Sequence, residues 1–387
     1  ANGDWSSDVC SSDLGALKMS SKEYFIYLLS CWLNKEKPRG SEETKWAEIL
    51  ALAERHGVTA VIAGKIKELP HGSRPKGKLL SAFEDRHADS YRDYEIKMRA
   101  MTRLIETLSQ AGIDHLLVKG AVLRFLYPSP QLRTSGDTDV VVRPHEYENA
   151  IEALKNAGFR IDFVKQYFSQ IAYGGELFDL HTELESINVQ SKIYYSTPFE
   201  DISENTGHTY KLKPIYHLLY IITHIAYHLK NGGAGVRMIM DVDALLRYYP
   251  NMDMARFTAL CDNIKIKNTA QALIALSKKW FKTPVAVDYT FEDTDEQSLY
   301  QYLSGILLSG GIFGDPLGSD ARDPAQNGEE GINTGNKPSA KSFLKRFIGR
   351  LSSAKKANGN SFEKQEMSFR YSEILSELQI EENHHYD

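Results

Sequence analysis

Two aspartates separated by one residue, Asp137 and Asp139, stand just before an apolar run at residues 140–142. A run of β-branched residues bounded by a glycine, here Gly136, predicts a buried strand. Alternate side chains of a strand share a face, so both carboxylates can point the same way. Two carboxylates on one face repel each other unless a cation lies between them. Mg²⁺ prefers oxygen ligands and is the cation we expect there.

A third carboxylate, Asp179, falls in a later predicted strand at 176–184. A lone D-x-D pattern is common in solvated turns and helix caps, so the first pair alone favours a structural role. Three carboxylates that converge at strand ends, with Gly120 on a preceding turn, favour a catalytic site instead. If Asp179 faces away from the other two, Glu183 or Glu176 is the alternative third ligand.

Residues 114–143 resemble the nucleotidyltransferase superfamily, which has the polymerase-β-like fold. The resemblance is carried by Gly120-Ala121 on a turn and by D-x-D on the next strand. The longer pattern K-G-A, Y-P, R-x-x-G-D-T-D-V-V-V looks like a bacterial family of uncharacterised nucleotidyltransferases. The stretch F-D-L-H at 178–181 and a later helix with spaced histidines, at 217–241, extend the resemblance over roughly residues 100–315. The sequence departs from the family at Ala121, where the superfamily has serine, and at Thr182, where the family has tryptophan.

The resemblance implies transfer of a nucleotidyl group from an NTP to a hydroxyl, with release of pyrophosphate. Asp137, Asp139 and Asp179 would then be both the catalytic residues and the ligands of two Mg²⁺ ions, with Mn²⁺ as an alternative. Gly120 would let backbone N–H groups approach phosphate oxygens, because it has no Cβ. The other candidates for nucleotide contacts are Lys119, Ala121, Arg133 and Ser135. A surface charge is an equal alternative for Lys119, and an ion pair with the aspartates is an equal alternative for Arg133.

Three histidines, His181, His224 and His228, are candidates for lining the cleft. His224 and His228 are four residues apart on a predicted helix and can share one face. A zinc site would need further ligands with a sharper signature, so we favour a helix that lines the cleft opposite the sheet. His181 lies on the expected Asp179 face, where it could orient a metal ligand, contact substrate or simply pack. We expect Arg237, Asp241 and Asp243 to brace the helix pair that follows.

The elements that position these residues change their hydrophobic period near residues 113 and 205. Between these points we predict strands at 114–118, 139–143 and 177–183 in one sheet, with Gly174-Gly175 marking a hairpin turn. Ser20 and Glu23 form a capping-box pattern before the first predicted helix, Ser41 is expected to open the second, and a long helix is predicted over 79–111. We predict an α+β fold, a small mixed β-sheet flanked by helical modules. The predicted organisation is a foreign, disordered leader (1–18), a helical N-terminal module (19–112), the nucleotidyltransferase α/β core (113–205), a helical C-terminal module (206–314), a flexible linker (315–340) and a polar helical tail (341–387).

Composition excludes several classes of protein. A net charge of −5 and a pI near 6.2 argue against a broad nucleic-acid binder, which would be basic. The three cysteines, Cys10, Cys31 and Cys261, have neither metal nor disulfide spacing, which fits a reducing cytoplasm. No apolar run approaches the roughly 18–20 residues that cross a bilayer, so we expect no membrane contact. The expected partners are an NTP and a hydroxyl acceptor, which could be a small molecule, a protein or an RNA end.

Two function classes stay open. The first is a metal-dependent nucleotidyltransferase, which the three aspartates favour. The second is a catalytically inactive nucleotidyltransferase fold that serves as a binding or scaffolding module, which Ala121 keeps open because a hydroxyl often contacts phosphate at that position. A kinase is a weaker third class, because the sequence has neither a G-x-x-x-x-G-K-[ST] loop nor the kinase signature set.

Overall fold

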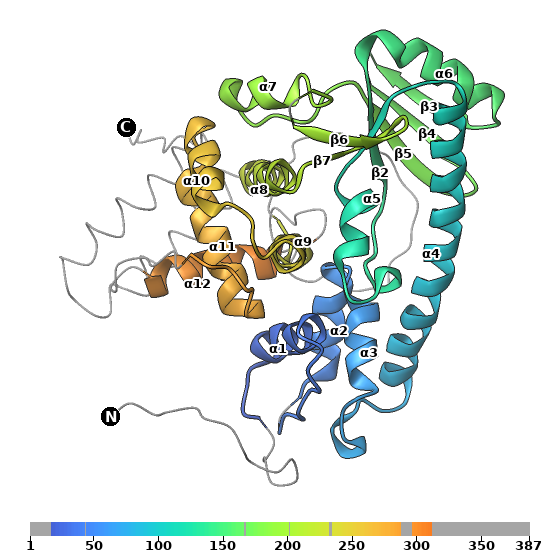
Figure 1. Cartoon of the computed structure of the whole chain (residues 1–387). Coiled ribbons are helices and arrows are strands. Elements are labelled where there is room, and N and C mark those ends of the chain that lie inside the picture. Colours follow the sequence, from blue (N-terminus) through green and yellow to red (C-terminus); the bar gives the residue numbers. More distant parts are fainter. Residues whose placement is uncertain are drawn as a thin grey trace, which may run out of the picture.

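The computed structural model describes residues 17–42, 44–165, 168–200, 202–231, 234–287 and 296–311. The expected linker at 315–340, the expected tail and all but the last two residues of the expected leader lie outside these residues. Within them the chain forms a mixed seven-stranded sheet flanked by helices (Figure 1), so the α+β prediction is confirmed. None of the described helices is both long and apolar enough to span a membrane.

The strand order in the sheet is β3-β4-β5-β2-β1-β7-β6. The strands are β1 (His115–Leu117), β2 (Thr138–Val142), β3 (Arg160–Lys165), β4 (Phe168–Tyr173), β5 (Glu176–His181), β6 (Ser203–Thr206) and β7 (Thr209–Leu212). β1 pairs antiparallel with β2, β2 pairs parallel with β5, and β1 pairs parallel with β7. The three strands expected at 114–118, 139–143 and 177–183 therefore lie in one sheet, as predicted, and β7 continues that sheet beyond residue 205.

The local signals for one helix cap and one turn agree with the structure. Ser20 caps the first helix, with Glu23 completing a capping box. Gly174 and Gly175 both have positive φ, 60° and 90°, in the tight hairpin between β4 and β5. The second helix begins at Trp46 and not at Ser41, which instead forms a β-bridge with Leu17. The expectation for Ser41 was wrong because the backbone there pairs with the chain before the first helix.

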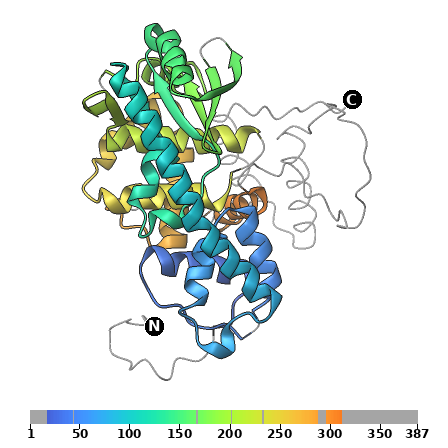
Figure 2. The same cartoon turned by 90° about the vertical axis from the view of Figure 1, so that its right-hand side faces the viewer.

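The α-helices are α1 (Ser21–Leu33), α2 (Trp46–Arg55), α3 (Thr59–Ile66), α4 (Lys78–Gln110), α5 (Gly120–Leu123), α6 (Tyr147–Asn156), α7 (Val189–Tyr195), α8 (Pro214–Asn231), α9 (Val236–Tyr248), α10 (Met254–Asn263), α11 (Lys267–Phe281) and α12 (Glu296–Gly310). Figures 1 and 2 show α4 running from the α1–α3 end of the molecule to the sheet. α4 and α6 cover one face of the sheet, where Val140 and Phe178 belong to the smaller of two hydrophobic clusters.

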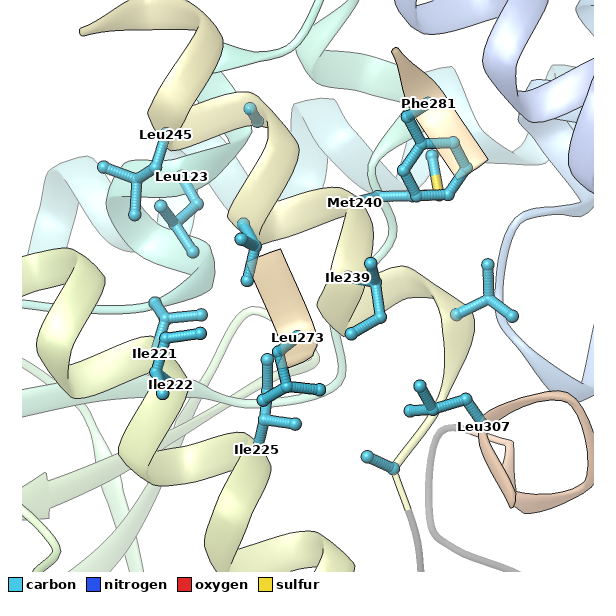
Figure 3. Close-up of a cluster of buried hydrophobic side chains, with 14 of the residues drawn as sticks. Leu123, Ile221, Ile222, Ile225, Ile239, Met240, Leu245, Leu273, Phe281 and Leu307 are labelled. Carbon is cyan, nitrogen blue, oxygen red and sulfur yellow. The ribbon is translucent and has the colours of Figure 1, made fainter. Parts of the chain in front are cut away.

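The larger hydrophobic cluster joins helices from both ends of the chain. Figure 3 shows part of it, with side chains of α8, α9, α11 and α12 and Leu123 of α5. α1 belongs to the same cluster, and its C-cap residue Asn34 donates a hydrogen bond to the carbonyl of Phe281 at 2.9 Å. His56, after α2, lies with its Nε2 3.3 Å from the carbonyl of Leu308. The helices before and after the sheet therefore share one core.

Candidate active site

The parallel pairing of β2 with β5 aligns two of the three candidate aspartates. Asp139 and Asp179 are register partners, and alternation along β2 points Asp139 away from the α4–α6 face, to which Val140 belongs. Asp137 precedes β2 and is exposed. All three aspartates line one cavity of about 890 Å³. The structure thus brings together the three carboxylates that the sequence singles out.

The carboxylates are close enough to influence one another. Burial raises the pKa of Asp179, and the negative charges of Asp137 and Asp139 raise it further. The amide of Gln170 partly opposes this effect, because its Nε2 donates to Asp179 Oδ1 at 3.2 Å. Asp179 therefore faces the other two, and the alternative ligands Glu183 and Glu176 are not needed to complete a carboxylate triad.

Asp139 already has a cationic neighbour. Lys119 Nζ donates to Asp139 Oδ1 at 3.0 Å, and His181 Nε2 lies 3.4 Å from the same oxygen. Burial alone would raise the pKa of Asp139, but Lys119 and His181 hold it well below its usual range. Burial likewise would lower the pKa of Lys119, but Tyr220 and Asp139 keep it above the usual lysine value. Lys119 and Asp139 are therefore a charged pair inside the cavity.

An unusual backbone conformation places Lys119 in the cavity. Its φ of 48° and ψ of −125° are those of the first central residue of a type II′ turn, a position that glycine usually occupies. The turn is closed by a hydrogen bond from Ala121 N to Val118 O at 3.2 Å. A non-glycine residue held in such a conformation costs about 1–3 kcal/mol and is most often found at functional sites.

The remaining candidates for nucleotide contacts are set apart from the cavity lining. Gly120, Ala121, Arg133 and Ser135 are not among the described residues that line the cavity. Arg133 is 6% exposed and forms a bidentate ion pair with Asp241 of α9, with distances of 2.9 and 2.8 Å. A Cβ added to Gly120 would lie 2.8 Å from Arg133 Nη1, so this glycine makes room for the guanidinium. Of the two roles considered for Arg133, the structure shows an ion pair, with Asp241 in place of the strand aspartates.

The loop that leads into Asp137 is held from behind by cationic side chains. Lys97 of α4 donates to Gly136 O at 2.6 Å, Arg237 of α9 donates to Thr134 O at 3.0 Å, and Arg124 donates to the hydroxyl of Ser135. Burial, together with the charge of Arg133, lowers the pKa of Arg124 and of Arg237 to about 10.

Lys97 and Arg124 were not predicted from the sequence. Lys97 could have been found, because it stands among the apolar residues of the buried face of α4.

The wall opposite the sheet comes from α8, as expected for His224 and His228. Both histidines line the cavity, together with Tyr220 and Tyr227. His224 Nδ1 lies 3.1 Å from Glu185 Oε2, and His228 Nε2 lies 3.2 Å from His224 Nε2. Glu185 was not predicted from the sequence, because it falls after the predicted strand in a loop with no periodic pattern. Asp243 pairs with Arg247 at 2.9 Å within α9.

Residues 42–282 match the model of a family described as uncharacterised nucleotidyltransferases. The chain belongs to this family. The matched segment contains all seven strands, the three aspartates and both α8 histidines. The family's description supports a nucleotidyltransferase in the broad sense, with an NTP as substrate. No curated protein matches the chain.

The three aspartates have the chemistry that Mg²⁺ prefers, because they offer only carboxylate oxygens. Within the part of the chain that the structure describes, no three or more His, Cys, Asp or Glu side chains are arranged as a metal site. The negative charges of Asp137 and Asp139 raise the pKa of Asp179, a repulsion that a divalent cation would relieve. Asp139 Oδ1 faces Lys119, so the Asp139 carboxylate would have to contact both the lysine and the cation or turn away from the lysine.

Proposed function

We propose that the chain is a metal-dependent nucleotidyltransferase that moves an NMP from an NTP to a hydroxyl acceptor and releases pyrophosphate. The observation that supports this most is the register of Asp139 with Asp179 on adjacent parallel strands, with Asp137 at the mouth of the same cavity. The cavity, at about 890 Å³, is at the large end of ligand sites and suits an NTP together with part of an acceptor. The acceptor would be a small molecule, a protein or an RNA end.

In this proposal Asp137, Asp139 and Asp179 would hold Mg²⁺, or Mn²⁺ in its place. The bound cation would neutralise phosphate charge and lower the pKa of the attacking hydroxyl. Lys119 has three N–H donors, so it can keep one on Asp139 and direct another at a phosphate oxygen. Its position is fixed by the type II′ turn before substrate arrives, which lowers the ordering cost of binding. Phe168 and Tyr227 line the cavity and offer aromatic faces for a nucleobase.

A second candidate function, an inactive nucleotidyltransferase fold used for binding or scaffolding, is favoured by one observation. Lys119 already compensates the charge of Asp139, at 3.0 Å, as a bound cation would. In a protein that no longer bound metal, such a pair would keep the buried carboxylate satisfied. The two candidates differ in whether NTP binding depends on a divalent cation.

Thermal unfolding with and without Mg²⁺ and each NTP separates these candidates. We expect the wild type to be stabilised by Mg²⁺ and NTP together, and Asp139→Asn to lose that stabilisation because a metal ligand is gone. Asp162→Asn is the matched control, because Asp162 is an exposed aspartate paired with Arg160 on β3, away from the cavity. If no NTP stabilises the wild type in a metal-dependent way, the transferase proposal fails and the scaffold is favoured.

The acceptor can be sought with NTPs labelled at the α-phosphate. We expect label to pass from the NTP to a component of a cell lysate with the wild type and not with Asp137→Asn. Asp162→Asn should transfer as the wild type does.

A further inference from the structure

The cavity has two chemically different walls. The sheet wall carries the three aspartates and Lys119, which suit a metal-bound triphosphate. The α8 wall carries His224 and His228, and Glu185 stands beside them on the loop after β5. Contacts of 3.1 and 3.2 Å connect Glu185 to His224 and His224 to His228. The proposed transferase chemistry assigns no role to these three side chains.

The ionisation of Glu185 determines which ring nitrogen of His224 carries a proton. Burial alone would raise the pKa of Glu185, but its hydrogen bond with His224 lowers it, so the carboxylate is ionised at neutral pH. An ionised carboxylate only accepts, so His224 must carry its proton on Nδ1. Burial lowers the pKa of both histidines, of His228 to about 4, so both rings are neutral.

In a neutral His224 with its proton on Nδ1, Nε2 is an acceptor. His228 must therefore donate from its own Nε2, which leaves Nδ1 of His228 with a free lone pair. Within the described residues this Nδ1 has no hydrogen-bond partner.

We propose that Glu185, His224 and His228 form a hydrogen-bonded relay in which His228 takes the proton from the acceptor's hydroxyl. This inference rests on the proposed transferase function. The acceptor O–H bond breaks, and its proton goes to Nδ1 of His228. The acceptor oxygen uses the released electron pair to form a bond to the α-phosphorus. The bond from the α-phosphorus to the β-bridging oxygen breaks, and its electron pair leaves with pyrophosphate.

The relay stabilises the imidazolium that this step creates. Protonated His228 still donates from Nε2 to His224, and His224 still donates from Nδ1 to Glu185, so the negative carboxylate is linked to the new positive charge. The serine-protease triad places a carboxylate directly behind its histidine base, whereas here His224 stands between Glu185 and the base. His228 is thus the proposed catalytic base, while His224 and Glu185 are positioning residues.

The charges that face the two rings agree with this assignment. Lys119 lowers the proton affinity of both histidines, while Glu185 raises it. Asp139 also raises that of His224. A triphosphate bound to Lys119 would neutralise the lysine and remove its opposing effect. The base would therefore gain strength when the NTP is in place.

The decisive variant is His228→Gln, because a glutamine side chain can keep an N–H toward His224 but cannot accept a proton. We expect it to bind the NTP with Mg²⁺ within about twofold of the wild type in the thermal-shift titration. With glycerol as a surrogate acceptor, we expect kcat for pyrophosphate release to fall by about 10²–10⁴-fold, the usual contribution of a general base, with the KM for the NTP unchanged. Glu185→Gln should lower kcat in the same direction.

The matched control is His208→Gln. His208 also pairs with a carboxylate, Asp114, at 2.9 Å, but it lies at the opposite end of β1 from Lys119 and does not line the cavity. We expect wild-type kcat and KM for this control.

Three results would overturn the relay. If His228→Gln binds NTP and its kcat stays within about threefold of the wild type, the relay is wrong and the transferase proposal stands. If the wild type shows no metal-dependent NTP binding, both fall together. The third result comes from nitrogen-15 NMR of the ligand-free protein, which reports tautomers without any activity. We expect Nδ1–H on His224 and Nε2–H on His228, and Nδ1–H on His228 would exclude it as the base.

Discussion

At the scale of single residues, Lys119 has three unusual features. It combines a positive φ of 48°, a charged partner at 3.0 Å and a place on the cavity wall. Strain of this kind persists only when surrounding contacts fix the conformation. Here the buried Ala121 and Leu123 of α5 follow the turn directly and pack into the two cores.

Replacing Lys119 by glycine and by alanine separates strain from charge. Both variants lose the ammonium, but only alanine keeps a Cβ at positive φ. We expect Lys119→Gly to be more stable than Lys119→Ala by about 1–2 kcal/mol in urea unfolding, although glycine elsewhere costs stability. Equal stability of the two variants would show that the turn is not strained.

The Lys119–Asp139 pair also predicts a dependence of stability on pH. The pKa of Asp139 is lower in the folded than in the unfolded protein, so the pair stabilises the fold above the ordinary aspartate pKa of about 3.9. That contribution is lost as the pH falls below this value. The pKa of Lys119 is raised, so its contribution is lost only above the ordinary lysine pKa of about 10.4.

We therefore expect the loss of unfolding free energy in Lys119→Met to be largest between roughly pH 5 and pH 8. It should shrink below about pH 4, because Asp139 takes up a proton in the folded variant, which lacks the lysine, whereas the wild-type carboxylate stays ionised. Urea unfolding at a series of pH values measures it. A deficit that stays constant down to pH 3 would contradict the pairing.

Gly120 and Gly136 give a matched pair of glycine substitutions. A Cβ at Gly120 would lie 2.8 Å from Arg133 Nη1, whereas one at Gly136 would meet nothing within 4 Å. We expect Gly120→Ala to lose about 1–3 kcal/mol, the usual cost of overpacking, and Gly136→Ala to be near neutral in thermal unfolding. Similar losses in both variants would mean that backbone freedom, and not the guanidinium, decides the residue at 120.

At the scale of elements, α4 connects the N-terminal helices to the loop before Asp137. Its buried Lys97 donates to Gly136 O at 2.6 Å and forms an ion pair with Glu176 of β5. Lys97→Met would leave Glu176 as an unpaired charge that is 15% exposed. We expect a loss of about 3–5 kcal/mol, much of it recovered in Lys97→Met/Glu176→Gln. Denaturant melts of both variants test this, and an additive double variant would contradict it.

The elements with strong local signals were predictable from the sequence. The apolar runs of β1 and β2 and the glycine pair before β5 each have a local physical cause, and the structure places these strands as expected. β7 gave a weaker signal, because its short sequence Thr-Tyr-Lys-Leu is polar and half-buried. Its place in the sheet comes from pairing with β1, which lies far away in the sequence.

The aspartates could be placed because alternation along a strand and register between strands are regular. The pairing of Arg133 with Asp241 could not, because it joins residues 108 positions apart and depends on how α9 docks. The Lys119–Asp139 pair depends on a lysine in a conformation that sequence rules reserve for glycine. The contacts missed by sequence analysis are therefore those fixed by tertiary packing.

At the scale of the whole molecule, the helices on both sides of the sheet form one core. α1, α3, α8, α9 and α11 all contribute side chains to the larger hydrophobic cluster. We therefore expect a single cooperative thermal transition for the full chain. A chain lacking residues 19–112 should show none, because it would expose the core faces of α8 and α11. Calorimetry of both chains tests this, and a cooperative melt of the shortened chain would show that the later helices fold alone.

The hydrogen bond between Asn34 and the carbonyl of Phe281 spans 247 residues. During synthesis, α1 is therefore made long before its partner in α11. At the usual rate of roughly 5–20 residues per second, α1 leaves the ribosome about 12–50 s before α11 exists. Throughout that interval Phe25, Leu28 and Leu29, fully buried in the finished protein, lack their later partners. The nascent chain must keep this apolar helix from aggregating for many seconds, which makes it a natural client for chaperones that act at the ribosome exit.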